Sequence, residues 1–207
     1  MLSMATTRKR LKAHERRARI LGAAEQEFAA RGFHSTSMDD IASAAGITKP
    51  VLYDHFSSKL DLYRQLTEGI RDELTGRGAA AMAADAPPDR RIRTGIEAFF
   101  AFVEERPSAA RVLLFTPVGE PELVDAAREV QAGATAALAA LLVSEPNLLA
   151  GAPDRERRIE LLTEFMKQGL HGLAEWWSQH PETPREALVD AATDLVWSGL
   201  RGGYRSP

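Results

Sequence analysis

Residues 41–53 read Ile-Ala-Ser-Ala-Ala-Gly-Ile-Thr-Lys-Pro-Val-Leu-Tyr, a pattern that indicates two short helices joined by a tight turn. Small residues at Ala42 and Ala45 allow the helices to cross closely, and Gly46 permits the positive φ that a sharp turn requires. Three aliphatic side chains can form a small shared core: Ile41, Ile47 and Leu52. The other side chains after the turn then point outward, as on a recognition helix that enters the major groove of DNA.

The sequence on either side supplies the helices that complete a small domain. Gly32 can end a first helix, and Ser37 is placed to cap the next one with Asp40 in the capping-box position. Thr48 can cap a third helix that tolerates Pro50 in its first turn. Three short helices are thus predicted: residues 12–31, 38–45 and 49–56. Together they have the size of a helix-turn-helix unit.

The remaining sequence also has helical periodicity, and we find no run with the two-residue period of a β-strand. Prolines and glycines separate six further predicted helices: residues 59–84, 92–103, 112–115, 121–143, 159–177 and 185–200. The expected fold class is therefore all-α with about nine helices. It comprises an N-terminal arm and three-helix helix-turn-helix domain over residues 1–60 and a C-terminal helical bundle over residues 61–207.

Charge is distributed unevenly along the chain. Residues 1–64 carry 11 Lys and Arg against 7 Asp and Glu, whereas residues 65–207 carry 15 against 22. Seven basic side chains face only Glu15 within the first twenty residues. A basic arm on an otherwise acidic protein favours a polyanionic partner at that end, although a solvated tail would have the same composition.

Composition excludes several classes of protein. None of the 207 residues is cysteine, which rules out disulfides, zinc–thiolate sites, iron–sulfur clusters and a cysteine nucleophile. The sequence contains no apolar run of about 18 residues that could cross a membrane. The basic N-terminus is not followed by the apolar stretch of a signal peptide. We therefore expect a cytoplasmic protein with no membrane association.

Three segments of the sequence carry a resemblance to a known family. They are Thr36-Ser37-Met38-Asp39-Asp40-Ile41-Ala42, then Ala45-Gly46-Ile47-Thr48-Lys49-Pro50-Val51-Leu52-Tyr53-Asp54-His55-Phe56, then Ser58-Lys59-Leu60-Asp61-Leu62. In this register they resemble the DNA-binding signature of the TetR (tetracycline-repressor) family. The resemblance implies an all-helical homodimer with an N-terminal helix-turn-helix domain and a C-terminal domain for small effectors. Most such proteins are repressors that effector binding releases from a double-stranded, pseudo-palindromic operator.

The resemblance also implies roles for individual side chains. Lys49 would read a base, since lysine can donate to guanine N7 and O6, and Pro50 and Val51 would make apolar contacts. Phosphate contacts are implied for three side chains: Tyr53, His55 and Lys59. Two helix N-termini would also favour phosphate: those at Ser37 and Thr48. Relatives often carry a hydroxyl residue at the position of Val51, so a polar base contact is not expected there.

The C-terminal region offers two candidate sites. The family places an effector cavity among its later helices, and seven residues could line it: Phe99, Phe102, Phe115, Leu138, Phe165, Met166 and Trp176. Each of them could equally belong to a close-packed core. Small and apolar residues on the last two helices suit a four-helix dimer interface: Gly169, Leu173, Trp177, Leu188, Ala192, Leu195, Val196 and Gly199. The apolar cavity candidates favour an apolar or amphipathic effector.

Enzymatic alternatives find little support in the sequence. None of the five histidines is paired at i, i+4, and no metal-protease motif, nucleophile elbow or phosphate-binding glycine loop occurs. We expect no enzyme activity, metal or cofactor. The rival hypotheses are a helical ligand-binding or scaffold protein without sequence-specific DNA binding, a small helical enzyme, and, within the family, an activator or a regulator without an effector.

Overall fold

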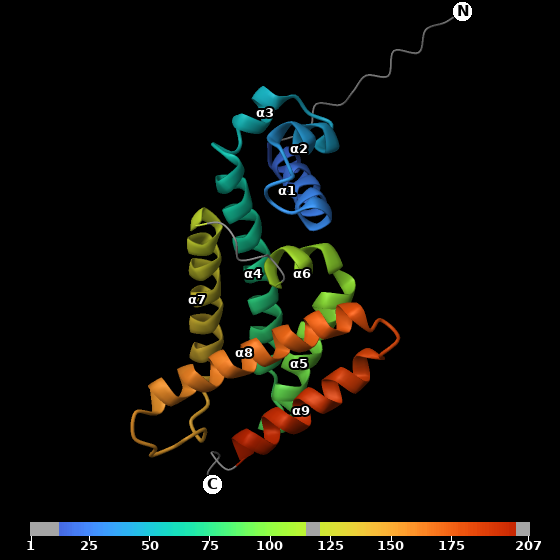
Figure 1. Ribbon diagram of the computed structural model, residues 1–207. Helices are drawn as coiled ribbons and strands as arrows, with labels where there is room; N and C mark the ends of the chain where they lie inside the picture. Colours follow the sequence, from blue (N-terminus) through green and yellow to red (C-terminus); the bar gives the residue numbers. More distant parts are fainter. Residues whose placement is uncertain (1–12, 115–120, 202–207) are drawn as a thin grey trace, which may run out of the picture. The chain divides into compact units, whose positions relative to one another are not determined.

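The structure is a computed structural model that describes residues 13–114 and 121–201 (Figure 1). The chain forms two compact units, Met1–Leu66 and Thr67–Pro207. Across the described residues every regular element is an α-helix, and nine helices are present. This confirms the all-α fold class.

The N-terminal unit contains three helices and the start of a fourth. Helices α1 (Ala13–Arg31), α2 (Met38–Ala45) and α3 (Lys49–Tyr53) are followed by α4 (Lys59–Met82), which continues into the C-terminal unit. Their shared core is fully or almost fully buried: Ile20, Phe28, Ile41, Leu52, Phe56 and Leu62. The third helix is shorter than predicted: it ends at Tyr53, and the His55 N–H then donates to the Leu52 carbonyl only three residues back, as in a tighter turn.

The C-terminal unit contains the remainder of α4 and five further helices: α5 (Pro88–Glu105), α6 (Pro107–Leu114), α7 (Pro121–Val143), α8 (Arg155–Gln179) and α9 (Arg185–Arg201). Figure 1 shows α8 and α9 as neighbouring helices joined by a short connection. A core of buried side chains lies among α5, α8 and α9, including Phe100, Ile159 and Leu188. The Arg155 guanidinium donates to the carbonyls of Val143 and Leu148, which fixes the connection after α7.

Candidate nucleic-acid interface and ligand cavity

The turn between α2 and α3 has the geometry that residues 41–53 predict. Gly46 adopts φ 62°, and its N–H donates to the Ser43 carbonyl at 3.0 Å. The Ile47 N–H donates to the Ala42 carbonyl, also at 3.0 Å, so two carbonyls at the end of α2 are satisfied. A Cβ at Gly46 would come within 2.7 Å of the Arg19 guanidinium, and the left-handed φ disfavours any side chain there.

Helix α3 presents its outer face to solvent. Thr48, Lys49, Pro50 and Tyr53 are exposed, whereas Leu52 on the opposite side is completely buried. Tyr53 retains 45% of its accessible surface, so it is not part of the core. Two further predicted contact residues are partly buried: Val51 and His55. Six predicted contact residues between Thr48 and His55 thus lie on α3 or close to one of its ends.

The Lys49 ammonium is held by an acidic side chain of the preceding helix. Its Nζ lies 2.8 Å from Oδ2 of Asp39 in the first turn of α2. This hydrogen bond and the charge of Asp39 raise the pKa of Lys49 above its usual 10.5. Both side chains are at least half exposed, so a DNA base could approach the ammonium beside Asp39. The sequence analysis missed this partner, although an acidic residue in a first helical turn is visible in the sequence.

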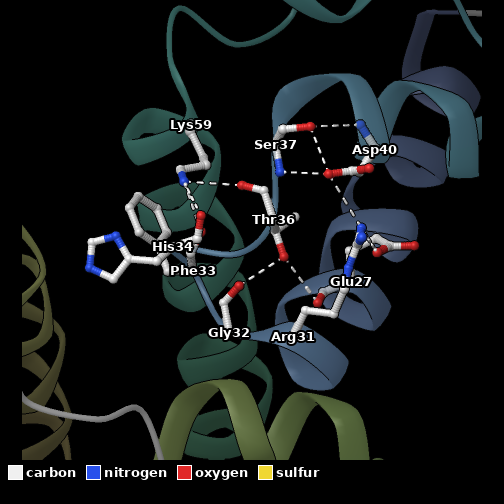
Figure 2. Close-up of polar contacts among 9 residues, drawn as sticks. All are labelled: Glu27, Arg31, Gly32, Phe33, His34, Thr36, Ser37, Asp40 and Lys59. Carbon is white, nitrogen blue, oxygen red and sulfur yellow. Dashed lines mark hydrogen bonds and ion pairs between the residues drawn. The ribbon is translucent and has the colours of Figure 1, made fainter.

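Lys59 has a structural role that the sequence did not reveal (Figure 2). Its Nζ donates to the carbonyls of Phe33, His34 and Thr36 at 2.8, 3.4 and 3.0 Å and lies 4.3 Å from the Phe33 ring centroid. Burial lowers the pKa of this ammonium below 10.5. The three bonds clamp the start of α4 to the loop between α1 and α2. A phosphate contact from Lys59 stays a prediction, and it would require one of these bonds to open.

The same loop is fixed from its other end by a capping box. The Ser37 hydroxyl accepts from the Asp40 N–H at 3.1 Å, and the Asp40 carboxylate accepts from the Ser37 N–H at 2.9 Å. The Asp40 carboxylate also accepts from the Ser37 hydroxyl at 2.7 Å, and this bond together with the one from the Ser37 N–H lowers the pKa of Asp40 below 3.8. Thr36, which is completely buried, donates to the Gly32 and Glu27 carbonyls (Figure 2). Ser37 is therefore confirmed as a helix cap, while its phosphate contact stays a prediction.

A largely apolar cavity of about 140 Å³ lies within the C-terminal unit. Helices α4, α5, α7 and α8 contribute most of its walls. Three of the predicted lining residues are found there: Phe99, Leu138 and Met166.

Three other residues predicted to line an effector cavity do not line this one, and each has a geometric reason. Phe165 precedes Met166, so it faces about 100° away around α8 and is 72% exposed. Trp176 is 43% exposed and stacks on His180 with ring centroids 3.9 Å apart. Phe102 is completely buried outside the cavity, with the Arg77 guanidinium 5.4 Å from its ring centroid. Phe115 lies outside the described residues.

The predicted dimer residues divide into three groups. Leu188 and Ala192 do not lie on an exposed surface as the prediction requires, because their side chains are buried in the core of the protomer itself. Three others are partly buried against that core: Leu173, Trp177 and Val196. The remaining three are exposed: Gly169, Leu195 and Gly199.

An exposed apolar face does occur on α8 and α9. Leu161 and Phe165 lie one turn apart on α8 and are 57% and 72% exposed. Trp176, further along α8, and Leu195, on α9, are also exposed large side chains. The sequence analysis missed Leu161, although its i, i+4 spacing from Phe165 was available as a signal. We refer to these four side chains as the α8–α9 apolar face.

An ion pair within α8 lies beside the cavity, and hydrogen bonds to Thr135 connect it to α7. The Lys167 Nζ lies 2.8 Å from Oε2 of Glu164 and 2.6 Å from the Thr135 hydroxyl, and the Lys167 side chain is 4% exposed. Hydrogen bonds from Gln168, Lys167 and Thr135 lower the pKa of Glu164 from 4.5 to about 2. The Glu164 carboxylate therefore stays charged at neutral pH.

His171, one turn beyond Lys167, lines the cavity as a neutral imidazole. Burial, with a smaller contribution from the Lys167 ammonium, lowers its pKa from 6.5 to about 4. The unfolded chain thus binds a proton near pH 6.5 that the folded chain binds only near pH 4, so stability is lost as the pH falls through this window.

We expect the free energy of unfolding to fall by about 1 kcal/mol between pH 7.5 and pH 5.5 because of His171. Urea denaturation at both pH values measures the loss. The His171→Gln variant should lack this component, since it has no group titrating there, whereas Glu164 keeps its contribution until the pH falls below about 4.5. An equal loss in both proteins would contradict the assignment.

Among the described residues, no helix combines the length and apolar character needed to cross a bilayer. The same residues hold no group of three or more His, Asp or Glu side chains placed to bind a metal ion.

Comparison with known proteins agrees with this geometry. The family described as "Bacterial regulatory proteins, tetR family" matches residues 20–66. The transcriptional activator FasR of Mycolicibacterium smegmatis is 31% identical over 192 residues, covering 92% of this chain and 85% of FasR. The regulator EthR of the same organism is 32% identical, covering 91% of this chain and 87% of EthR.

A solved structure has the same fold. FadR of Bacillus subtilis, crystallised with stearoyl-CoA, superimposes with a TM-score of 0.75 at 19% identity, covering 88% of this chain and 98% of FadR. The sequence relatives named here are transcriptional regulators and not enzymes. This chain therefore belongs to the TetR family of helix-turn-helix transcriptional regulators, which bind DNA.

Proposed function

We propose that the protein is a ligand-responsive repressor that binds a pseudo-palindromic operator as a homodimer. The observation that carries the proposal is the exposed outer face of α3, where Thr48, Lys49, Pro50 and Tyr53 lie opposite the buried Leu52. Side chains at the start of such a helix contact base edges in the major groove. Ser37, Val51, His55 and Lys59 complete the proposed set of DNA contacts.

The α8–α9 apolar face supports a second copy of this chain as the partner. Leu161, Phe165, Trp176 and Leu195 would be buried between two copies of α8 and α9 in a four-helix arrangement. Gly169 and Gly199 are exposed on the same helices and leave room for close approach. A two-fold axis would set the two α3 helices about 34–36 Å apart, one turn of the DNA. The operator would then consist of two inverted half-sites.

The cavity supports a small effector of apolar or amphipathic character. The likeness to FadR, which was crystallised with stearoyl-CoA, adds support for an acyl-type molecule. Effector binding would favour a dimer conformation whose α3 spacing no longer fits the operator. We assign DNA reading to residues 1–60 and effector binding with dimerisation to residues 61–207. The protein would act in the cytoplasm, where its operator lies.

Activation is a second candidate, because FasR is named as an activator and is 31% identical to this chain. Operator fragments can be selected with the purified protein from genomic DNA and placed before a reporter gene. A repressor should lower reporter output when co-expressed, and an activator should raise it. Two results together would instead favour a ligand-binding or scaffold protein without sequence-specific DNA binding. The protein would float with anionic liposomes, and it would show no salt-sensitive retention of any DNA fragment.

The roles proposed for α3 side chains can be separated by substitution. We expect Lys49→Ala to relax preference at one or two base pairs, with a loss of about 1–3 kcal/mol at those positions only. His55→Ala should weaken binding to all sequences by a similar factor, because a phosphate contact orients the helix without reading a base. Fluorescence anisotropy with single-base operator variants at several salt concentrations measures both effects. Indistinguishable profiles for the two variants would contradict the assignment.

A further inference from the structure

The polar groups in the cavity wall indicate which chemical group the effector carries, an inference that rests on the proposed function. The wall is apolar except on the side formed by α4, α7 and α8. Polar side chains there include Arg71, Gln131, Lys167 and His171. The hydrogen-bond and ion-pair partners that these side chains already have determine which chemical group a ligand must supply.

Both cations at this side are already paired. The Lys167 ammonium has three acceptors, namely Glu164 Oε2, the Thr135 hydroxyl and the Gln131 carbonyl oxygen at 2.8, 2.6 and 3.3 Å. The Arg71 Nε and Nη2 both donate to Oδ1 of Asp72, at 3.0 and 2.7 Å. A ligand carboxylate would be attracted less strongly by these paired cations than by free ones, and it would lose its own hydration. The ion pairs therefore disfavour an anionic group.

Two uncharged groups in the same wall are left without hydrogen-bond partners among the described residues. Gln131 Oε1 is buried and accepts no hydrogen bond. The His171 imidazole, stacked on Phe99 with centroids 5.9 Å apart, forms no hydrogen bond and is neutral at physiological pH. A buried acceptor without a donor is unfavourable, so a ligand that supplies the donor removes this penalty.

We propose that the effector is an apolar molecule with an uncharged group that both donates and accepts a hydrogen bond. The hydrogen of an amide or a hydroxyl would be donated to Gln131 Oε1, and its oxygen would accept the N–H of His171. A carboxylate in the same place would bring a second acceptor toward Gln131 Oε1 and could not supply the missing donor. This selectivity follows from which polar groups of the wall are paired and which are not.

Three eight-carbon probes with different end groups test the proposal. Octanamide, octan-1-ol and octanoate are titrated into the full-length protein without DNA at pH 7.5 by calorimetry. The amide and the alcohol should each bind at least tenfold more tightly than octanoate. Gln131→Leu should remove most of this preference, because the unpaired acceptor is gone. The matched control Gln179→Leu, at the exposed end of α8, should keep it.

Equal or tighter binding of octanoate would overturn the proposal, as would an unchanged preference in Gln131→Leu or no measurable binding of the amide and the alcohol. If only one of the two binds, the common end group is wrong and the proposal fails in its general form. Release of operator DNA is measured separately. Binding of the amide without release would contradict the proposed effector response and leave the assigned end-group selectivity standing.

Discussion

Phe165→Asp is expected to convert the proposed dimer to a monomer and to lower operator affinity by about 10²–10⁴-fold. The substitution places a charge at the most exposed aromatic side chain of the α8–α9 apolar face. In a dimer this carboxylate would be buried without a partner and next to its symmetry copy, which is strongly unfavourable. Separated protomers would lose the effective concentration that joins the two half-sites. Sedimentation velocity and operator titration measure the two effects.

Ser178→Asp provides the control, since it adds the same charge to an exposed position of α8 on a different face. That variant should remain a dimer with unchanged operator affinity. The folded state of both variants can be compared by thermal denaturation, because an exposed position should tolerate aspartate within about 0.5 kcal/mol. A fully dimeric Phe165→Asp protein would remove the α8–α9 apolar face as the interface.

Leu52→Ala is expected to destabilise the N-terminal unit by about 3 kcal/mol and to abolish operator binding, with the C-terminal unit still folded. Leu52 is completely buried between α3 and the rest of that unit, and truncation of a buried leucine leaves a cavity. The two units have separate cores, which is the physical reason for expecting separate unfolding.

The position of the tryptophans allows this prediction to be measured directly. All three, Trp176, Trp177 and Trp197, belong to the C-terminal unit, so tryptophan fluorescence reports on that unit alone. Circular dichroism should show an early helical transition in Leu52→Ala that fluorescence does not follow. Val51→Ala, a partly buried neighbour, should leave both transitions near those of the wild-type protein. Coincident early transitions by both probes would show that the units unfold together.

The N-terminal unit could be predicted from the sequence because its signals are local. Gly46 adopts the expected positive φ, and Ser37 and Asp40 form the expected capping box. These features depend on residues a few positions apart, and tertiary contacts have little opportunity to change them. The clamp at Lys59 was not predictable in this way, because its acceptors are carbonyls 23–26 residues earlier in the chain.

The C-terminal sites were harder to predict because α8 is apolar on more than one side. Met166 lines the cavity while its neighbour Phe165 is exposed, and residue type alone does not distinguish these positions. Leu188 and Ala192 have the pattern of an interface, but the same pattern also fits the core of the protomer to which they belong. Only the three-dimensional arrangement separates cavity, core and exposed face.

The ion pair between Asp39 and Lys49 bears on how an operator is distinguished from the rest of a genome. The two charges of the pair cancel at long range. Lys49 therefore adds little to the sequence-independent electrostatic attraction between the protein and DNA. Its charge becomes available only where a base offers an acceptor good enough to replace the carboxylate. At other sites Lys49 would stay paired with Asp39, so incorrect sequences would gain nothing from its charge.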